Sequence, residues 1–442
     1  MPLPRHNRKS MPLARAEWMP LAVIAALSLL ACGLWLVRGR RVESPTSSAA
    51  SAPSAPVVPP PVAAPPMPLP APMHAEELRG ATAGPTGNLV VARSPQPQPT
   101  SLNGDLQRSV TAMLAKAGVP YSAVVMIDPH TGQVLTLAES RDASDRVGDI
   151  GSLTKPTVPA ASVIKVVTSA ALLEAGATPD SEACFHGGFH GLDASHVAQK
   201  PSDRRCETLT LALARSSNAA FARFALRDLQ PGQLKAMAER FGFNCGVPSD
   251  IAMESSRFDD AGDALARAKA AAGFAGSTLS PLHAAWLAAV VASDGKLKRI
   301  AAWDPAVQVL VDSPQRSPLP QAIAERTAAA LRMMMVQTTE VGTGRHGFSH
   351  RPKALQGMAV GGKTGSLSAS EGELFRHVSW FVGFAPAERP RVAIAALAVN
   401  GSKWKVKAPA LARDALGLFF EHAGQKTADA AGFGLDEVGA AL

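Results

Sequence analysis

Ser162 and Lys165 lie three residues apart in PAASVIKVVTSAALLEAG (159–176), a mostly apolar stretch that we expect to form a buried helix. Residues at this spacing share one face of a helix, so their side chains can meet. A serine hydroxyl is a poor nucleophile until a base removes its proton. A lysine can act as that base when burial or a nearby cation disfavours its ammonium form. The pair therefore predicts a nucleophilic serine with Lys165 as its general base.

Ser-x-x-Lys is a short pattern, and the chain contains it at three other places: Ser152/Lys155, Ser293/Lys296 and Ser402/Lys405. The first is followed by Pro156, which disfavours a helix there. The second encloses Asp294-Gly295, which predicts a turn, and the third follows a strand-like run. Only Ser162 is expected to open a helix, at the positive end of the helix dipole. For this pair alone, a lysine that reaches water from a core helix remains a competing interpretation.

Two further motifs strengthen the catalytic interpretation. Ser216-Ser217-Asn218 lies in a helical, apolar context and supplies a hydroxyl and an amide two residues apart. Lys363-Thr364-Gly365 follows two glycines in a strand-like run, with Ser366 next. Gly365 would let a ligand approach the backbone, and an edge strand can pair with an extended peptide.

The elements that would position these residues alternate in type along the chain. A helix is predicted over 105–118, and the strand-like runs YSAVVMID and QVLTLAES flank a turn at 129–132. Helical patterns dominate from about 160 to 290, and one of them is LTLALARSSNAAFARFALRDL. Strand-like runs return over 356–368, 377–386 and 391–400, before a final helix over 410–424. This order predicts an α+β fold, in which helices flank an antiparallel sheet and an all-helical subdomain is inserted.

The three motifs, in this order, resemble the signature of penicillin-binding proteins and class A β-lactamases. Residues 101–425 resemble the transpeptidase domain of penicillin-binding proteins, which cross-link bacterial peptidoglycan. The segments AAGFAGSTLSPLHAAWLAAVVASDGK, VGTGRHGF and HVSWFVGFAPAERPRVAIAALAVN are also similar to parts of that domain. The resemblance implies that the Ser162 helix starts at the junction between the sheet and the helical subdomain.

The resemblance also implies roles for the motif residues. Ser162 would be the acylated nucleophile, Lys165 its general base, and Ser216 a proton relay toward the leaving amine. Lys363 would keep that network electropositive. The expected substrate-binding residues are Asn218 for a peptide amide, Thr364 for the terminal carboxylate, Gly365 for close approach, and Ser366. The backbone N–H groups of Ser162 and Ser366 would form the oxyanion hole.

The implied activity is that of a D,D-transpeptidase on D-Ala-D-Ala stem peptides, inhibited covalently by β-lactam antibiotics. The same residues would also serve a D,D-carboxypeptidase, an endopeptidase or a serine β-lactamase, because these enzymes share the acylation step. A non-catalytic sensor or scaffold is a third possibility. We expect no cofactor, and cell-wall synthesis proteins are possible partners.

The sequence departs from the family at two positions beside these motifs. Ala161 precedes the nucleophile where the family commonly has glycine. Position 366 is serine rather than the usual threonine, which keeps a hydroxyl at the carboxylate-binding position.

The N-terminal region predicts a membrane-anchored protein. Residues 19–37 are uncharged and mainly apolar, enough for ~28 Å of helix, and basic residues flank them. We expect residues 1–18 to be cytoplasmic, 19–37 to form one transmembrane helix in the inner membrane, and 38–100 to form a Pro/Ala/Ser-rich linker. A cleaved signal peptide remains an alternative for the apolar segment. The catalytic domain, 101–425, would lie in the periplasm, and residues 426–442 would be a tail.

The net charge of +8 does not predict nucleic-acid binding. Residues 1–41 hold seven Lys or Arg against Glu17 alone, so most of the excess charge flanks the apolar segment. No strongly basic globular surface is left to bind a phosphate backbone.

Cys184 and Cys206 bracket a Gly- and His-rich stretch before the Ser-Ser-Asn motif. In an oxidising compartment they could form a disulfide that braces this insertion. His186, His190 and His196 with Cys184 suggest a zinc site as an alternative, but their irregular spacing argues against it. We therefore predict a disulfide and no metal.

Overall fold

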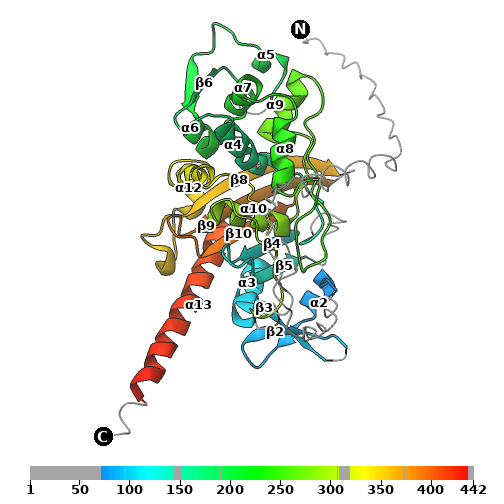
Figure 1. Ribbon diagram of the computed structural model, residues 1–442, viewed down its shortest axis with the longest axis vertical. Coiled ribbons are helices and arrows are strands. Elements are labelled where there is room, and N and C mark those ends of the chain that lie inside the picture. The colour runs from blue at the N-terminus through cyan, green and yellow to red at the C-terminus, as the bar shows by residue number, and fades with distance from the viewer. Residues whose placement is uncertain are drawn as a thin grey trace, which may run out of the picture. The chain divides into compact units, whose positions relative to one another are not determined.

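The computed structural model describes residues 71–94, 96–142, 152–188, 191–305, 307, 319–371 and 374–436. A five-stranded antiparallel sheet in the order β5-β4-β10-β9-β8 lies at the centre of this part of the chain (Figure 1). Its strands are β4 (Tyr121–Ile127), β5 (Val134–Arg141), β8 (Gly361–Glu371), β9 (Leu374–Ala385) and β10 (Val392–Asn400). The early and late strand-like runs thus join one sheet, because β10 pairs with β4.

Helices cover both faces of the sheet, which explains why its central strands β4 and β10 are buried at every position. Helix α10 (Pro281–Ala292) packs on one face, against β4, β9 and β10. Helices α3 (Gly104–Lys116) and α13 (Ala408–Asp436) pack on the other face. Successive side chains of a strand point to opposite faces, so Val125 belongs to the first core and Val124 to the second. The predicted antiparallel sheet with flanking helices is confirmed.

The chain between β5 and β8 carries the inserted subdomain, which gathers above the sheet in Figure 1. Its helices are α4 (Ile164–Glu174), α5 (Ala194–Val197), α6 (Leu209–Arg215), α7 (Asn218–Asp228), α8 (Gln233–Arg240) and α9 (Ala264–Ala272). The prediction that it is all-helical was wrong. Strands β6 (Glu182–Phe185) and β7 (Arg205–Thr208) pair as an antiparallel hairpin within it. Strands this short give only a weak sequence pattern.

Further elements connect the subdomain to the sheet. Helix α12 (Glu325–Glu340) contacts both β8 and α6. The short 3-10 helices η2 (Arg345–Phe348) and η3 (Lys353–Leu355) follow before β8. Glu174, at the end of α4, accepts hydrogen bonds from the backbone N–H of Ala324 (2.8 Å) and the hydroxyl of Thr327 (2.7 Å). This carboxylate therefore ties the first turn of α12 to the end of α4.

The predicted linker was too long at its C-terminal end. The structure has helix α2 (Ala75–Arg79) and a three-stranded sheet of β1 (Thr82–Ala83), β2 (Asn88–Val91) and β3 (Gln98–Asn103) in this region. Its buried apolar side chains belong to the main core, and they include Met73, Leu78, Leu89 and Val91. The sequence did not predict these elements, because a high proline content by itself argues against packing. The tail boundary was also misplaced, since α13 continues to Asp436.

The predicted transmembrane segment, 19–37, lies outside the described residues. Among the residues that the structure does describe, no helix has the length and apolarity needed to cross a bilayer.

Candidate active site

Ser162 lies in a sharp turn that starts the central helix of the subdomain. It belongs to the 3-10 helix η1 (Ala161–Val163), which continues directly into α4. Ala161 has a φ of +48°, in the left-handed region that is costly for a residue with a Cβ. Glycine adopts this region freely, which explains why glycine suits the position where this chain departs from its family. Trp380 holds the turn from the sheet, because its indole N–H donates to Pro159 O (3.0 Å).

Lys165 is fully buried, at 0% exposure, in the first turn of α4. All its neighbours in this helix from Ile164 to Leu172 are buried too, so the side chain has no path along the helix to water. Burial lowers the pKa of Lys165 well below its ordinary range, and the nearby charge of Lys363 lowers it further. The amine is therefore held in the state in which it can accept a proton.

The contacts of Lys165 direct its nitrogen at Ser162. Lys165 Nζ lies 2.8 Å from Ser162 Oγ, 2.8 Å from Asn218 Oδ1 and 2.6 Å from Ala272 O. A neutral amine has two N–H bonds and one lone pair. The amide oxygens of Asn218 and Ala272 can only accept hydrogen bonds, so they take the two N–H groups. The lone pair is then left for the Ser162 hydroxyl, which is the arrangement a general base requires.

Ala272 reaches Lys165 because helix α9 ends beside the turn that carries Ser162. The last carbonyls of a helix have no partner within it, and Ala272 O uses Lys165 instead. Gly273 ends the helix with a φ of +84°, and a Cβ there would lie 2.2 Å from Ala161 O. Only glycine permits this approach. A backbone acceptor carries no residue-type signal, so Ala272 was missed by the sequence analysis.

The Lys-Thr-Gly motif lies on β8, the edge strand of the sheet on the side of η1. Lys363 is 0% exposed, and its ammonium donates to Thr364 O (2.7 Å). Burial lowers the pKa of Lys363 to about 7. A Cβ at Gly365 would lie 3.3 Å from Val163 Cγ2, so the strand passes directly against the turn that carries Ser162. Ser366, the next residue, is exposed.

Thr343 joins the Lys-Thr-Gly strand to the Ser-Ser-Asn turn. Its Oγ1 lies 2.6 Å from Thr364 Oγ1, and its backbone N–H donates to Ala214 O (3.0 Å). Ala214 lies two residues before Ser216. Thr343 belongs to VGTGRHGF, a segment similar to the family in which no pattern marks a role for the threonine.

The Ser-Ser-Asn motif interrupts what the sequence suggested was one continuous helical pattern. Ser216 ends α6 with a φ of +58°, and Asn218 starts α7. Asn218 Oδ1 accepts a hydrogen bond from Lys165 Nζ. Ser216 lies in the same turn, but among the described residues no hydrogen bond joins its hydroxyl to Lys165 or Lys363. The structure thus brings Ser162, Lys165 and Asn218 into direct contact, with Lys363 and Thr364 on the adjacent strand.

The three other Ser-x-x-Lys pairs have no such contact between their side chains. Ser152 Oγ accepts from the backbone N–H of Thr154 and Lys155. Ser293 Oγ donates to Lys296 O (2.8 Å), and Lys405 donates to Gly118 O (2.8 Å). Only the Ser162 pair combines a buried amine with a hydroxyl.

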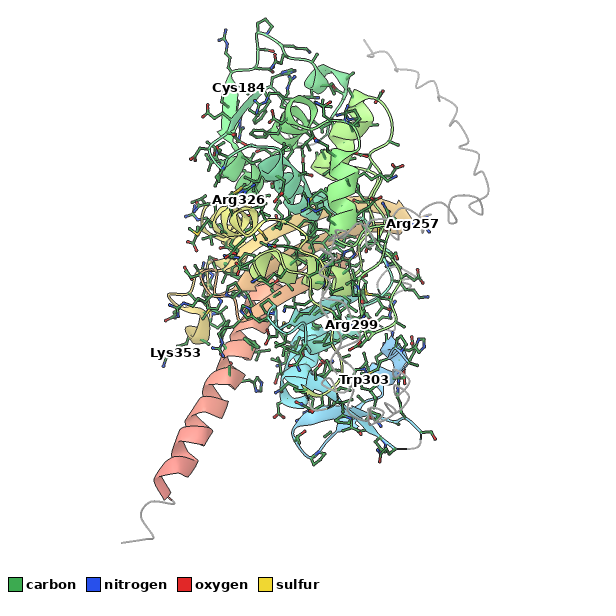
Figure 2. The ribbon with its side chains drawn as sticks, in the orientation of Figure 1. Cys184, Arg257, Arg299, Trp303, Arg326 and Lys353 are labelled. Atoms are coloured by element: carbon green, nitrogen blue, oxygen red, sulfur yellow. A yellow bond between two sulfur atoms is a disulfide. The ribbon has the colours of Figure 1, made fainter. Side chains whose placement is uncertain are left out.

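Cys184 and Cys206 face each other across the β6–β7 hairpin and are joined by a disulfide. Figure 2 labels Cys184 on the inserted subdomain, away from the sheet. The bond removes the Cys184 thiolate that the zinc alternative needed. His190 lies outside the described residues, and in the described part of the chain no three His, Cys, Asp or Glu side chains form a metal-binding group.

The chain matches the penicillin binding protein transpeptidase domain over residues 122–416, and it belongs to this family. The peptidoglycan D,D-transpeptidase PbpA of Mycolicibacterium smegmatis is 28% identical over an alignment 316 residues long, which covers 63% of this chain and 62% of that protein. The PbpA of Mycobacterium tuberculosis is 27% identical over 313 residues, with the same coverage. The matched part thus spans less than two thirds of these relatives.

Solved structures of penicillin-binding proteins have the same fold. Penicillin-binding protein A from M. tuberculosis, as its imipenem acyl-enzyme complex, aligns with a TM-score of 0.58 and 25% identity, over 74% of this chain and 80% of that chain. A peptidoglycan glycosyltransferase from Burkholderia ambifaria aligns with a TM-score of 0.59 over 74% of this chain and 98% of that chain. Its identity is 20%, so this likeness concerns the fold alone.

Proposed function

We propose that the chain is a serine D,D-transpeptidase that cross-links peptidoglycan stem peptides and is inhibited by β-lactams. The observation that carries this proposal is the buried amine of Lys165, 2.8 Å from Ser162 Oγ, with its two N–H groups taken by carbonyl oxygens. The relatives named D,D-transpeptidases and the acyl-enzyme complex of a related protein support the same reaction class.

Acylation starts when Ser162 Oγ attacks the carbonyl carbon of the penultimate D-Ala. Lys165 takes the hydroxyl proton, and the developing oxyanion is bound by the backbone N–H groups of Ser162 and Ser366. The C–N bond then breaks, the proton taken by Lys165 passes through Ser216 to the nitrogen of the departing D-Ala, and an acyl-enzyme remains. An amine from a second stem peptide attacks the ester carbonyl and gives up a proton to Lys165. The C–Oγ bond breaks, the proton returns to Ser162 Oγ, and a new amide is formed.

The strand with the Lys-Thr-Gly motif binds the donor peptide. An extended peptide can add to the edge of the sheet at β8 through backbone hydrogen bonds. Thr364 binds the terminal carboxylate, Gly365 keeps the approach open, and Asn218 binds a peptide amide. The charge of Lys363 favours both the substrate carboxylate and the neutral form of Lys165.

A D,D-carboxypeptidase or a β-lactamase would use the same acylation step and differ only in delivering water to the ester. The names of the relatives favour an amine acceptor. Product analysis with a D-Ala-D-Ala stem peptide and a second peptide amine distinguishes these activities. A hydrolysed peptide without cross-linked product, or rapid turnover of a chromogenic β-lactam, would contradict transpeptidation.

We also propose that residues 19–37 anchor the protein in the inner membrane and that the proline-rich segment after them places the catalytic domain in the periplasm. The uncharged, apolar composition of this segment supports the anchor. Proteolysis within residues 38–70 should release the penicillin-labelled domain from isolated membranes. A domain that stays in the membrane fraction after complete cleavage would contradict this topology.

Penicillin labelling tests the catalytic proposal. Mass spectrometry of the protein after incubation with penicillin should find one adduct on the Ser162 peptide, because a β-lactam mimics D-Ala-D-Ala. Ser162→Ala should abolish the adduct. Ser402→Ala is the matched control, since it alters the serine of another Ser-x-x-Lys pair, and it should label normally. An adduct that persists in Ser162→Ala would overturn the proposal.

A further inference from the structure

Glu207 is a buried carboxylate that contacts the Ser-Ser-Asn turn and that the sequence analysis did not identify. It lies on β7, directly after the disulfide-bonded Cys206, and its side chain is 1% exposed. A charge removed from water in this way is costly unless it is fully paired. Its partners therefore indicate why the fold retains it.

The two oxygens of Glu207 have different partners. Oε1 accepts from Arg205 Nη2 (2.7 Å) and Arg215 Nη1 (3.3 Å). Oε2 accepts from the hydroxyl of Ser217, the middle residue of the Ser-Ser-Asn motif. Burial alone would raise the pKa of Glu207, but the hydrogen bonds from Ser217 and Arg205 outweigh it and lower the pKa. The group is thus a charged acceptor at neutral pH.

Ser217 forgoes its usual local interaction to make this contact. It is the N-cap residue of α7, where a serine oxygen ordinarily accepts from a backbone N–H of the first helical turn. No such bond is formed at the start of α7. The hydroxyl is directed at Glu207 instead, so a tertiary contact replaces the local cap.

The residue after Ser217 is Asn218, whose Oδ1 accepts from Lys165 Nζ (2.8 Å). We propose that Glu207 is a positioning residue: through Ser217 it holds the turn so that Asn218 orients the amine of Lys165 toward Ser162. Thr343, in the loop between α12 and η2, contacts the end of α6 just before this turn, because its backbone N–H donates to Ala214 O. Among the described hydrogen bonds, neither Glu207 nor Thr343 is joined to Ser162 directly, so both act on the site through the turn.

This inference rests on the proposed acylation of Ser162, and the full-length protein with a fluorescent penicillin tests it. Ser217→Ala removes the donor to Glu207 and should lower the second-order acylation rate constant about tenfold per folded molecule. Ser217→Thr restores a hydroxyl and should recover most of the rate. Glu207→Gln keeps an acceptor of equal size and should have a smaller effect than Glu207→Ala.

A matched control and a double-variant cycle separate positioning from general stability. Asp203 is another carboxylate of the subdomain, with a side chain that is 9% exposed and paired with Arg223 (2.9 Å). Asp203→Asn should lower the melting temperature without changing the rate per folded molecule. In an Asn218→Ala background, Ser217→Ala should lower the acylation rate constant by less than about twofold, because the two changes act through one contact.

Three outcomes are decisive. A wild-type rate in Ser217→Ala would overturn the inference, and so would an equal loss from Ser217→Ala with and without Asn218. A wild-type protein that takes no penicillin at Ser162 would overturn the proposed function, and this inference with it. If penicillin labels the wild-type protein at Ser162 and Ser217→Ala is acylated at the same rate, the inference is overturned while the proposed function stands.

Discussion

At the scale of single residues, the site depends on two buried lysines with different surroundings. Lys165 has a hydroxyl and two carbonyl oxygens around its nitrogen, and it is suited to accept a proton. Lys363 donates to a backbone carbonyl on the edge strand, where its charge can act on the substrate and on Lys165. Residue type alone does not separate these roles, because both are lysines in apolar segments.

The pKa of Lys363 predicts how acylation depends on pH. Burial lowers this pKa to about 7, far below the ordinary value for a lysine, so the ammonium loses its proton as the pH rises through neutrality. The second-order acylation rate constant of the free enzyme should therefore fall above about pH 7. Lys363→Arg keeps its charge over the whole range and should lack this alkaline decline. A wild-type rate that rises steadily from pH 6 to 9 would contradict the prediction.

At the scale of elements, the site is assembled where three helices start or end beside strand β8. Ser162 lies just before α4, α9 ends at Ala272, and α7 starts at Asn218. Such termini expose backbone groups and permit close approach, which the interior of a helix does not. Gly273, which ends α9, and the β6–β7 hairpin, which carries Glu207, both support this arrangement, and substitutions test each of them.

Gly273→Ala should separate α9 from the turn that carries Ser162. The new Cβ would lie 2.2 Å from Ala161 O, at a φ of +84°. Overpacking and the left-handed conformation together should cost about 2–4 kcal/mol of unfolding free energy. Acylation should fall as well, because Ala272 O no longer fixes Lys165. Urea unfolding and penicillin labelling measure the two effects.

Gly232→Ala is the matched control for this substitution. Gly232 has the same φ of +84°, but a Cβ there would meet nothing within 4 Å. It should show the conformational cost alone and an unchanged acylation rate. Equal effects from the two substitutions would show that the contact with Ala161 is unimportant.

Removal of the disulfide should weaken the hairpin that carries Glu207. Cys184 and Cys206 are separated by 22 residues, and closing a loop of that length contributes about 3 kcal/mol. The double variant Cys184→Ser with Cys206→Ser should lose roughly that unfolding free energy in denaturant titrations. An unchanged midpoint in the double variant would contradict a bracing role.

At the scale of the whole molecule, the N-terminal sheet is part of the catalytic domain rather than of the linker. Met73 exchanges backbone hydrogen bonds with Asp250 (2.7 Å) and Ala252 (2.8 Å), and Ser101 N–H donates to Ala302 O (2.9 Å). These contacts fasten the segment before α3 to loops that lie about two hundred residues further along the chain. The segment from Met73 to Ser101 therefore belongs to this domain.

Two truncations test this boundary. A protein that starts at residue 71 should keep the melting temperature of the full chain. One that starts at residue 101 loses Met73, Leu78, Leu89 and Val91 from the core, at about 1.5–3 kcal/mol for each fully buried side chain. Its melting temperature should fall markedly. Equal melting temperatures for the two truncated proteins would instead support the linker over 38–100 that the sequence predicted.

The sequence by itself determined the family, the antiparallel sheet with its flanking helices, and the choice of Ser162 among four Ser-x-x-Lys pairs. Each of these depends on residue types at short spacing or on periodicity, which are local properties of a chain. The tertiary structure alone decided that Ala272 O, Thr343 and Glu207 surround the motifs, and that residues 71–100 fold. These are contacts between distant segments, several of them through backbone atoms, and the physical reason that no sequence pattern marks them is that backbone groups are the same at nearly every residue.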